Sequence, residues 1–225
     1  MTPKLEVCID SISGLEACVI GKVDRIELCS SLEYGGLTPS DELMKLASEV
    51  NIPCRAMIRP KKGSFVYSRE DLNQMFEDID KARSFNLEGV VFGATLTNGE
   101  LDQVFLDELM SHSHGLNKTL HRAVDTIPNI IESVEIAINL DFDTILSSGG
   151  FKTAMEGMTV LKAMQKKASG RIEIMPGSGI NPQNISKILS NCDFAWVHSS
   201  CSIHRQNKKM TDTQTIKDLK NAFYL

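Results

Sequence analysis

The sequence lacks the features that would place it in several specialised classes. No two of its six cysteines form a Cys-x-x-Cys pair, which argues against zinc-ribbon and thioredoxin-type motifs. No apolar run approaches the length of about 18 residues that indicates a membrane-spanning helix. The N-terminal MTPKLEVCID has no basic segment before an apolar core, unlike a signal peptide. We therefore expect a soluble, cytoplasmic protein with reduced thiols and no membrane partner.

An excess of basic residues is also missing. Lys and Arg number 24 against 29 Asp and Glu, which makes the formal net charge -5. Because phosphate backbones select positively charged surfaces, this balance argues against a nucleic-acid partner. Hydrophobic residues are 42% of the 225 residues and charged residues 24%, values that are ordinary for a globular protein and argue against disorder.

The chain instead alternates short apolar runs with segments of helical periodicity. The eight runs begin at Lys4, Arg25, Cys54, Gly89, Asn117, Thr144, Arg171 and Phe194. Most are followed by a segment such as Ile185, Ile188 and Leu189, in which apolar residues recur at i, i+3 and i+4. Repeated strand–helix units predict parallel strands with right-handed crossovers. Eight units predict a single (β/α)8 TIM barrel over residues 1–225, with an open doubly wound sheet as the alternative.

Local signals predict where some elements begin and end. Thr153 with Glu156 fits a capping box, and Asn181 before Pro182 fits an N-cap followed by proline at the first helical position. We expect the polar stretch 201–210 to be a loop and 213–223 to be the last helix.

The first two predicted strands carry the same short pattern, Glu6-Val7-Cys8 and Glu27-Leu28-Cys29. Because side chains alternate along a strand, we expect both glutamates and both cysteines to face the barrel interior at matched heights. A pair of thiolates is a soft site that favours Cu(I) or zinc. Buried cysteines also pack simply as small apolar side chains, which is the alternative interpretation.

Acid–base candidates gather at the strand ends where TIM-barrel sites form. His121 and Asp125 follow the fifth run, and imidazole titrates near neutral pH. The candidate catalytic set is His121, Glu6, Glu27 and Asp125. A carboxylate inside a barrel needs a partner, so structural ion pairs of the glutamates with Arg59 or Arg122 are the alternative.

Basic and glycine-rich segments predict an anion site. Arg59 ends the third run and precedes two lysines, and guanidinium groups bind oxyanions well. A Gly-Ser-Gly segment runs into a predicted helix, where backbone N–H groups and the helix dipole favour an anion. The candidate anion-binding residues are Arg59, Gly177, Ser178, Gly179 and Ser199.

Ten segments together identify a family resemblance. They are Glu6–Cys8, Asp24–Cys29, Gly35–Ser40, Met57–Pro60, Phe65–Ser68, Gly89–Gly93, His121–Asp125, Ser147–Gly150, Pro176–Ile180 and His198–Ser200. In this order, over nearly the whole chain, they resemble the CutC family, which is named for copper homeostasis. The resemblance implies a (β/α)8 barrel, a cytoplasmic role in copper homeostasis, and Cu(I) ligands at Cys8 and Cys29. The segment Lys61–Ser64 departs from the family pattern of an arginine, two glycines and an acid, and Val124 stands where phenylalanine is usual.

Two functions follow as hypotheses. The first is a CutC-like protein that binds Cu(I) through the two cysteines. The second is a TIM-barrel enzyme that acts on a small phosphorylated or carboxylated metabolite. A non-catalytic scaffold, whose polar strand ends are all paired with one another, is a third. The sequence decides neither whether the protein is an enzyme nor whether it forms a homo-oligomer.

Overall fold

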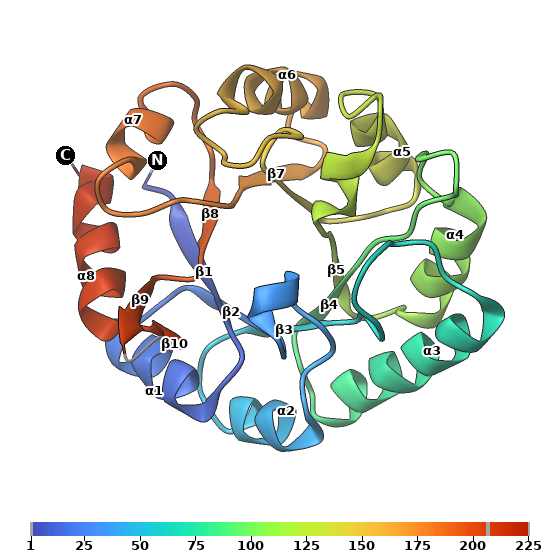
Figure 1. The fold of residues 1–225 in the computed structure, drawn as a ribbon, viewed down its shortest axis with the longest axis horizontal. Helices are drawn as coiled ribbons and strands as arrows, with labels where there is room; N and C mark the ends of the chain where they lie inside the picture. The colour runs from blue at the N-terminus through green and yellow to red at the C-terminus, as the bar shows by residue number, and fades with distance from the viewer. Residues whose placement is uncertain (1, 206–207, 225) are drawn as a thin grey trace.

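Eight parallel strands form the centre of the molecule in the computed structural model, which describes residues 2–205 and 208–224 (Figure 1). The strands are β1 (Lys4–Ile9), β2 (Arg25–Leu28), β3 (Cys54–Met57), β4 (Gly89–Phe92), β5 (Asn117–Leu120), β6 (Thr144–Ser147), β7 (Glu173–Pro176) and β8 (Trp196–Ser199). Their order is β7-β6-β5-β4-β3-β2-β1-β8, and β7 lies beside β8, which nearly closes the ring. The predicted (β/α)8 barrel is confirmed, and the open doubly wound sheet is wrong.

Helices surround the strands as an outer ring (Figure 1). They are α1 (Ile12–Gly21), α2 (Asp41–Ser48), α3 (Arg69–Ser84), α4 (Gln103–His112), α5 (Ser133–Asn139), α6 (Met158–Ala168), α7 (Ile185–Leu189) and α8 (Thr213–Asn221), with short 3-10 turns η1 (Leu32–Tyr34), η2 (Arg122–Thr126) and η3 (Ala222–Tyr224). Within the described ranges, none of the helices combines the length and apolarity needed to cross a membrane.

The longest helix, α3, shows how the sequence builds these units. The Ser68 hydroxyl accepts a hydrogen bond from the Asp71 backbone N–H, and the Asp71 carboxylate accepts one from the Ser68 N–H. This capping box satisfies donors that a helix start leaves free. Leu72, Met75 and Ile79 then recur on one face and are fully buried, so the helix packs its apolar face inward.

Two predicted helix starts differ from the structure. Glu156 N–H does bond to Thr153 Oγ1, but the helix α6 begins only at Met158. The Asn181 side chain accepts from the N–H two residues on, which makes an Asx turn rather than a helix start, and α7 begins at Ile185.

The stretch expected to be a loop after β8 contains an antiparallel hairpin instead. Its strands are β9 (Ser202–Arg205) and β10 (Lys208–Thr211), and positions 206 and 207 lie outside the described residues. Most of the hairpin residues are polar and none is buried. Hydrophobic alternation, the main sequence signal of a strand, is therefore absent from them.

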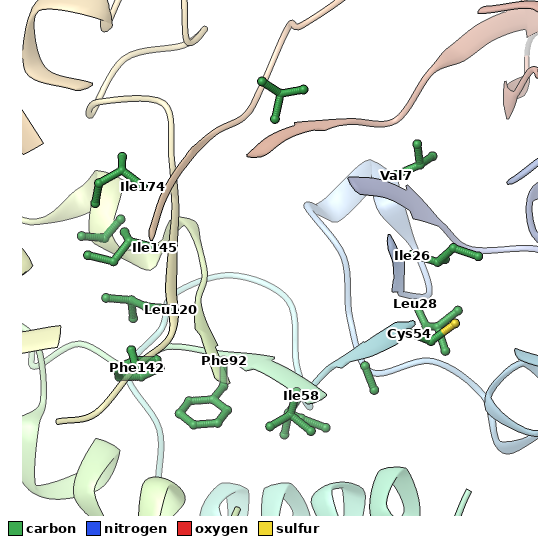
Figure 2. Packing of buried hydrophobic residues seen from close by; sticks show 14 of the residues in the cluster. Val7, Ile26, Leu28, Cys54, Ile58, Phe92, Leu120, Phe142, Ile145 and Ile174 are labelled. Carbon is green, nitrogen blue, oxygen red and sulfur yellow. The ribbon is translucent and has the colours of Figure 1, made fainter. Parts of the chain in front are cut away.

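The hydrophobic core lies between the strands and the helices. Figure 2 shows buried residues of this layer, including Val7, Ile26, Leu28, Phe92 and Ile145. Because side chains alternate along each strand, the residues between them point into the barrel. That interior carries charge, since Glu6, Arg25, Glu27 and Arg55 are all buried there.

The register of β1 against β2 departs from the expected matched heights. Glu6 pairs with Arg25 and Cys8 pairs with Glu27, so the two Glu-x-Cys patterns are offset by two residues. Closing a sheet into a barrel requires such stagger between strands. As a result Glu6 lies beside an arginine, and Cys8 lies beside a carboxylate instead of beside Cys29.

The packing of α4 gives a direct test of the fold. Leu106 is 0% exposed and Val104, on the same helix, is 76% exposed. We expect Leu106→Ala to lower the free energy of unfolding by about 2–5 kcal/mol, because it leaves a cavity. Val104→Ala should change it by less than about 0.5 kcal/mol. Urea unfolding of the two variants measures this, and equal losses would contradict the orientation of α4.

Candidate functional site

A cavity of about 540 Å³ opens at the carboxyl ends of the strands, where sites of this fold form. Its wall includes most of the residues predicted from the sequence. Those that line it are Cys8, Glu27, Arg59, His121, Asp125, Ser178, Gly179 and Ser199, together with His198.

Three buried side chains converge on one side of this cavity. One ligand atom each of Cys8, Glu27 and His198 lies within 4.8 Å of the others. His198 Nε2 is 3.8 Å from Glu27 Oε2. A thiol, a carboxylate and an imidazole at this separation are the donor types that bind transition metals.

A second layer of charged residues orients His198. Its Nδ1 lies 2.8 Å from Glu6 Oε1, and Arg25 Nε donates to Glu6 Oε2. The guanidinium of Arg25 also lies over the ring of Trp196, at 3.9 Å from its centre. Burial opposes ionisation of Glu6, but Arg25 and His198 lower its pKa to about 2. The ionised Glu6 carboxylate thus accepts a hydrogen bond from Nδ1 and orients the ring so that Nε2 faces Cys8 and Glu27. Metal-bound histidines are commonly oriented by a carboxylate in the same way.

The glutamate ion pair differs from the one expected. Arg25 is the partner of Glu6, whereas Arg122 pairs with Asp125. Glu6 does not line the cavity, but it contacts His198, which does, so in this structure it reaches the cavity through His198.

Charge is concentrated around His198. Burial raises the pKa of Glu27, and the nearby Glu6 charge adds to this, while His198 offsets part of it. Burial alone would lower the pKa of His198, but Cys8, Glu27 and Glu6 together raise it well above its usual range. Among the described residues, Glu27 Oε1 has no hydrogen-bond partner.

Cys29 lies next to this group without belonging to it. Its Sγ is 3.5 Å from Glu27 Oε2 and packs with Met57 and Val91. Burial and the Glu27 charge raise the pKa of the Cys29 thiol well above its usual range. The structure therefore brings Cys8 together with Glu27 and His198, and keeps Cys29 as a thiol that donates to Glu27.

Asp125 is held by donors from the loop after β6. Its carboxylate accepts from Ser147 Oγ at 2.6 Å, Ser148 N at 3.0 Å and Gly150 N at 3.1 Å, and from Arg122 Nε at 2.7 Å. Both oxygens are occupied within the protein. A carboxylate held in this way is better suited to anchoring the loop than to acting as a general base.

His121 has a different environment from the one expected of an acid–base residue. Its Nδ1 accepts from the Ala123 N–H at 3.2 Å, and its Nε2 has no partner in the described part of the chain. Burial and the Arg59 charge lower its pKa to about 3. A neutral imidazole that accepts at Nδ1 carries its hydrogen on Nε2, so His121 holds a buried hydrogen-bond donor.

Arg59 ties two loops to the end of β3. It donates from Nη1 to Tyr34 O at 2.8 Å and Gly36 O at 3.0 Å, and from Nη2 to Gly63 O at 3.0 Å. Its guanidinium carbon lies 4.7 Å from the centre of the Phe65 ring. Arg59 Nε is left without a partner among the described residues.

Most hydroxyl groups of the predicted anion site already donate hydrogen bonds within the protein. Ser178 Oγ donates to a backbone carbonyl of the loop after β6, and Ser199 Oγ donates to one of the loop after β7. Helix α7 has only five residues, so its dipole is small. Gly177 lies outside the cavity lining, and a Cβ there would come within 2.5 Å of Leu146, so close packing explains this glycine.

Comparison with known proteins decides the family. The CutC family model matches residues 3–203. The chain belongs to the CutC family. A CutC family protein of Rhizobium meliloti (strain 1021) is 50% identical over 198 residues, which cover 88% of this chain and 81% of that protein. One from Aliivibrio fischeri (strain MJ11) is 40% identical over 211 residues, covering 92% and 85%.

Solved structures agree with this membership. A Streptococcus agalactiae protein named CutC, and tied by that name to copper homeostasis, superposes with a TM-score of 0.84 at 31% identity, covering 89% of this chain and 99% of that one. N-(5'-phosphoribosyl)anthranilate isomerase from Pyrococcus furiosus superposes with a TM-score of 0.66 at 12% identity, a likeness that shows the barrel fold alone. The resemblance seen in the sequence is confirmed.

The Glu6 network makes stability depend on pH. Because the pKa of Glu6 falls from 4.5 to about 2 on folding, its stabilisation is complete above about pH 4.5 and is lost as the pH falls toward 2. We expect Glu6→Gln to lower the free energy of unfolding by about 3 kcal/mol at pH 7, since it leaves Arg25 and His198 unpaired. The deficit should shrink markedly at pH 3. Urea unfolding at both pH values measures it, with Glu132→Gln on the surface as the control.

A deficit that is the same at pH 7 and pH 3 would contradict the ionised state of Glu6. So would an equal effect of the surface variant.

Proposed function

We propose that this CutC family protein binds copper as Cu(I) in the barrel cavity, through Cys8, Glu27 and His198, and that it serves copper homeostasis in the cytoplasm. The observation that carries the proposal is the convergence of the three donors within 4.8 Å. The name shared by its relatives supplies the link to copper. The six cysteines are free thiols, which suits a reducing compartment.

The donor set fits the metal chemically. Thiolate is the ligand type that selects Cu(I) and imidazole also binds copper, whereas the carboxylate is a harder donor and the weakest of the three for Cu(I). Glu6 supplies the outer support that metal-bound histidines usually have, because it accepts from Nδ1 and leaves Nε2 as the metal ligand. The raised pKa of His198 means that the metal has to displace the Nε2 proton when it binds. The same three donor types also suit Zn²⁺, so zinc is the competing metal.

The proposed ligands differ in part from those implied by family resemblance. Cys8 is common to both sets, but His198 takes the place of Cys29. The offset of β1 against β2 supports this change, because it puts Glu27 beside Cys8 and moves Cys29 toward Met57 and Val91. The raised pKa of Cys29 also disfavours the thiolate form that binds metals.

A matched pair of cysteine variants tests the site. Anaerobic competition with a chromogenic Cu(I) chelator gives the affinity of the wild type, Cys8→Ser and Cys29→Ser. We expect about one equivalent of Cu(I) in the wild type. Changing a residue that only supports a metal ligand weakens metal binding by up to about 100-fold. Cys8→Ser removes a direct ligand, so it should weaken Cu(I) binding by at least about that factor. The Cys29→Ser variant should retain its affinity within a few-fold.

Equal losses in both variants would instead support the dicysteine site. Absence of Cu(I) binding in the folded wild type, or Zn²⁺ binding that Cu(I) does not displace, would overturn the copper proposal.

A further inference from the structure

We infer that the cavity also binds a small phosphorylated molecule, whose phosphoryl group lies between the Arg122 guanidinium and the loop after β7. This wall of the cavity is made by η2 and by the loops after β6 and β7, whereas the proposed copper ligands come from β1, β2 and β8. The site is independent of copper binding and adds a second ligand to the same cavity.

Arg122 brings an accessible guanidinium to the cavity. It lines the cavity, and its side chain is 42% exposed. Its Nε donates to Asp125 Oδ2 at 2.7 Å and its Nη2 donates to Ser148 Oγ at 2.9 Å, while Nη1 donates to no group within the described ranges. The edge formed by Nη1 and Nη2 is therefore left for a ligand. Such an edge binds the oxygens of a phosphate through two parallel hydrogen bonds.

The contact with Asp125 holds Arg122 in place without closing the site. The Asp125 carboxylate also accepts from Ser147 Oγ, Ser148 N and Gly150 N, so four groups share its charge. Its side chain is buried, and it contacts the guanidinium on the side away from the unused edge. The direction of this edge is thus set before a ligand arrives, which favours binding.

Positive charge exceeds negative charge in the cavity wall. Three cationic side chains, Arg59, Arg122 and Lys209, lie there with two carboxylates, those of Glu27 and Asp125. Among the three cations, Arg122 is the one that forms an ion pair with a described residue. The chain as a whole has a formal net charge of -5, so the cavity has the opposite sign. A cleft with excess positive charge attracts anions.

The loop after β7 adds backbone donors beside this arginine. Arg122 donates to Ser148, and Ser178 Oγ donates to the Lys152 carbonyl, so the loop after β6 contacts both sides of the proposed site. Gly179 is exposed and lines the cavity, and its N–H donates to no group of the described chain. Backbone N–H groups after the seventh strand are a frequent phosphate site in TIM barrels.

The donors and the size of the cavity favour a phosphate ester. The Arg122 edge and the Gly179 N–H offer three donors from two directions, which suits a tetrahedral group better than a planar carboxylate. The cavity of about 540 Å³ is much larger than a single ion. The rings of Tyr34 and Phe151, each 50% exposed, line it and provide apolar surface for an organic body. The serine hydroxyls that donate within the protein are not needed.

Isothermal titration calorimetry of the metal-free protein tests the site. The probes are glycerol 3-phosphate, ribose 5-phosphate and phenyl phosphate, with inorganic phosphate and succinate for comparison. The decisive variant is Arg122→Lys, which keeps the charge near Asp125 but lacks the edge with two nitrogens. Arg171→Lys is the matched control, because the Arg171 side chain is 46% exposed and pairs with Glu135 at 2.8 Å away from the cavity lining.

We expect at least one phosphate ester to bind the wild type and to bind Arg122→Lys about tenfold or more weakly, in line with loss of a hydrogen bond to a charged group. The Arg171→Lys variant should match the wild type. Amide NMR adds a readout that needs no variant. The Gly179 N–H resonance should shift when the ester binds, whereas that of Gly115, exposed before β5 at the opposite end of the barrel, should not.

Four results would overturn the inference. They are no binding of any phosphate ester, equal affinity of the wild type and Arg122→Lys, an equal loss in Arg171→Lys, and binding of succinate or inorganic phosphate that is as tight as that of every ester. Arg122→Lys leaves Cys8, Glu27 and His198 in place, so its Cu(I) affinity should equal that of the wild type. Failure here therefore leaves the copper proposal to its own test.

Discussion

The buried carboxylate of Glu6 is the interaction on which the barrel interior depends. It lies between Arg25 and His198, contacts one with each oxygen, and is fully buried. An isolated charge in such a place would be very unfavourable, so the two partners are needed for the fold to tolerate it. In return, the glutamate fixes which way the imidazole faces. The strand stagger that forms this pair also places Cys8 beside Glu27.

Unsatisfied groups are informative because the rest of the site is so well paired. The side chains of Asp125, Ser178 and Ser199 form hydrogen bonds to other groups of the protein and stabilise the loops around the cavity. By contrast, the cavity wall contains buried polar atoms of Glu27 and His121 that have no partner in the described chain. Native proteins keep few such groups, and each calls for an explanation such as a bound ion, a bound water or a catalytic role. The architecture therefore supports a binding role more strongly than a purely structural one.

Much of the fold followed from local pattern. The strand–helix alternation located all eight strands, and alternation along them correctly turned Cys8 and Glu27 inward. The offset between β1 and β2 was not predictable, since it depends on barrel closure and not on either strand alone. His198 stood out only within one of the segments shared with the CutC family, because its contact with Glu6 spans 192 residues. The polar hairpin of β9 and β10 has no periodic signal to find.

X-ray absorption spectroscopy at the copper edge of the Cu(I)-loaded protein tests the central claim most directly. It counts the sulfur and the nitrogen or oxygen neighbours of the metal. Our account predicts one sulfur, from Cys8, together with nitrogen and oxygen donors from His198 and Glu27. A spectrum with two sulfur neighbours and no imidazole scattering would contradict it, and would return Cys29 to the metal site.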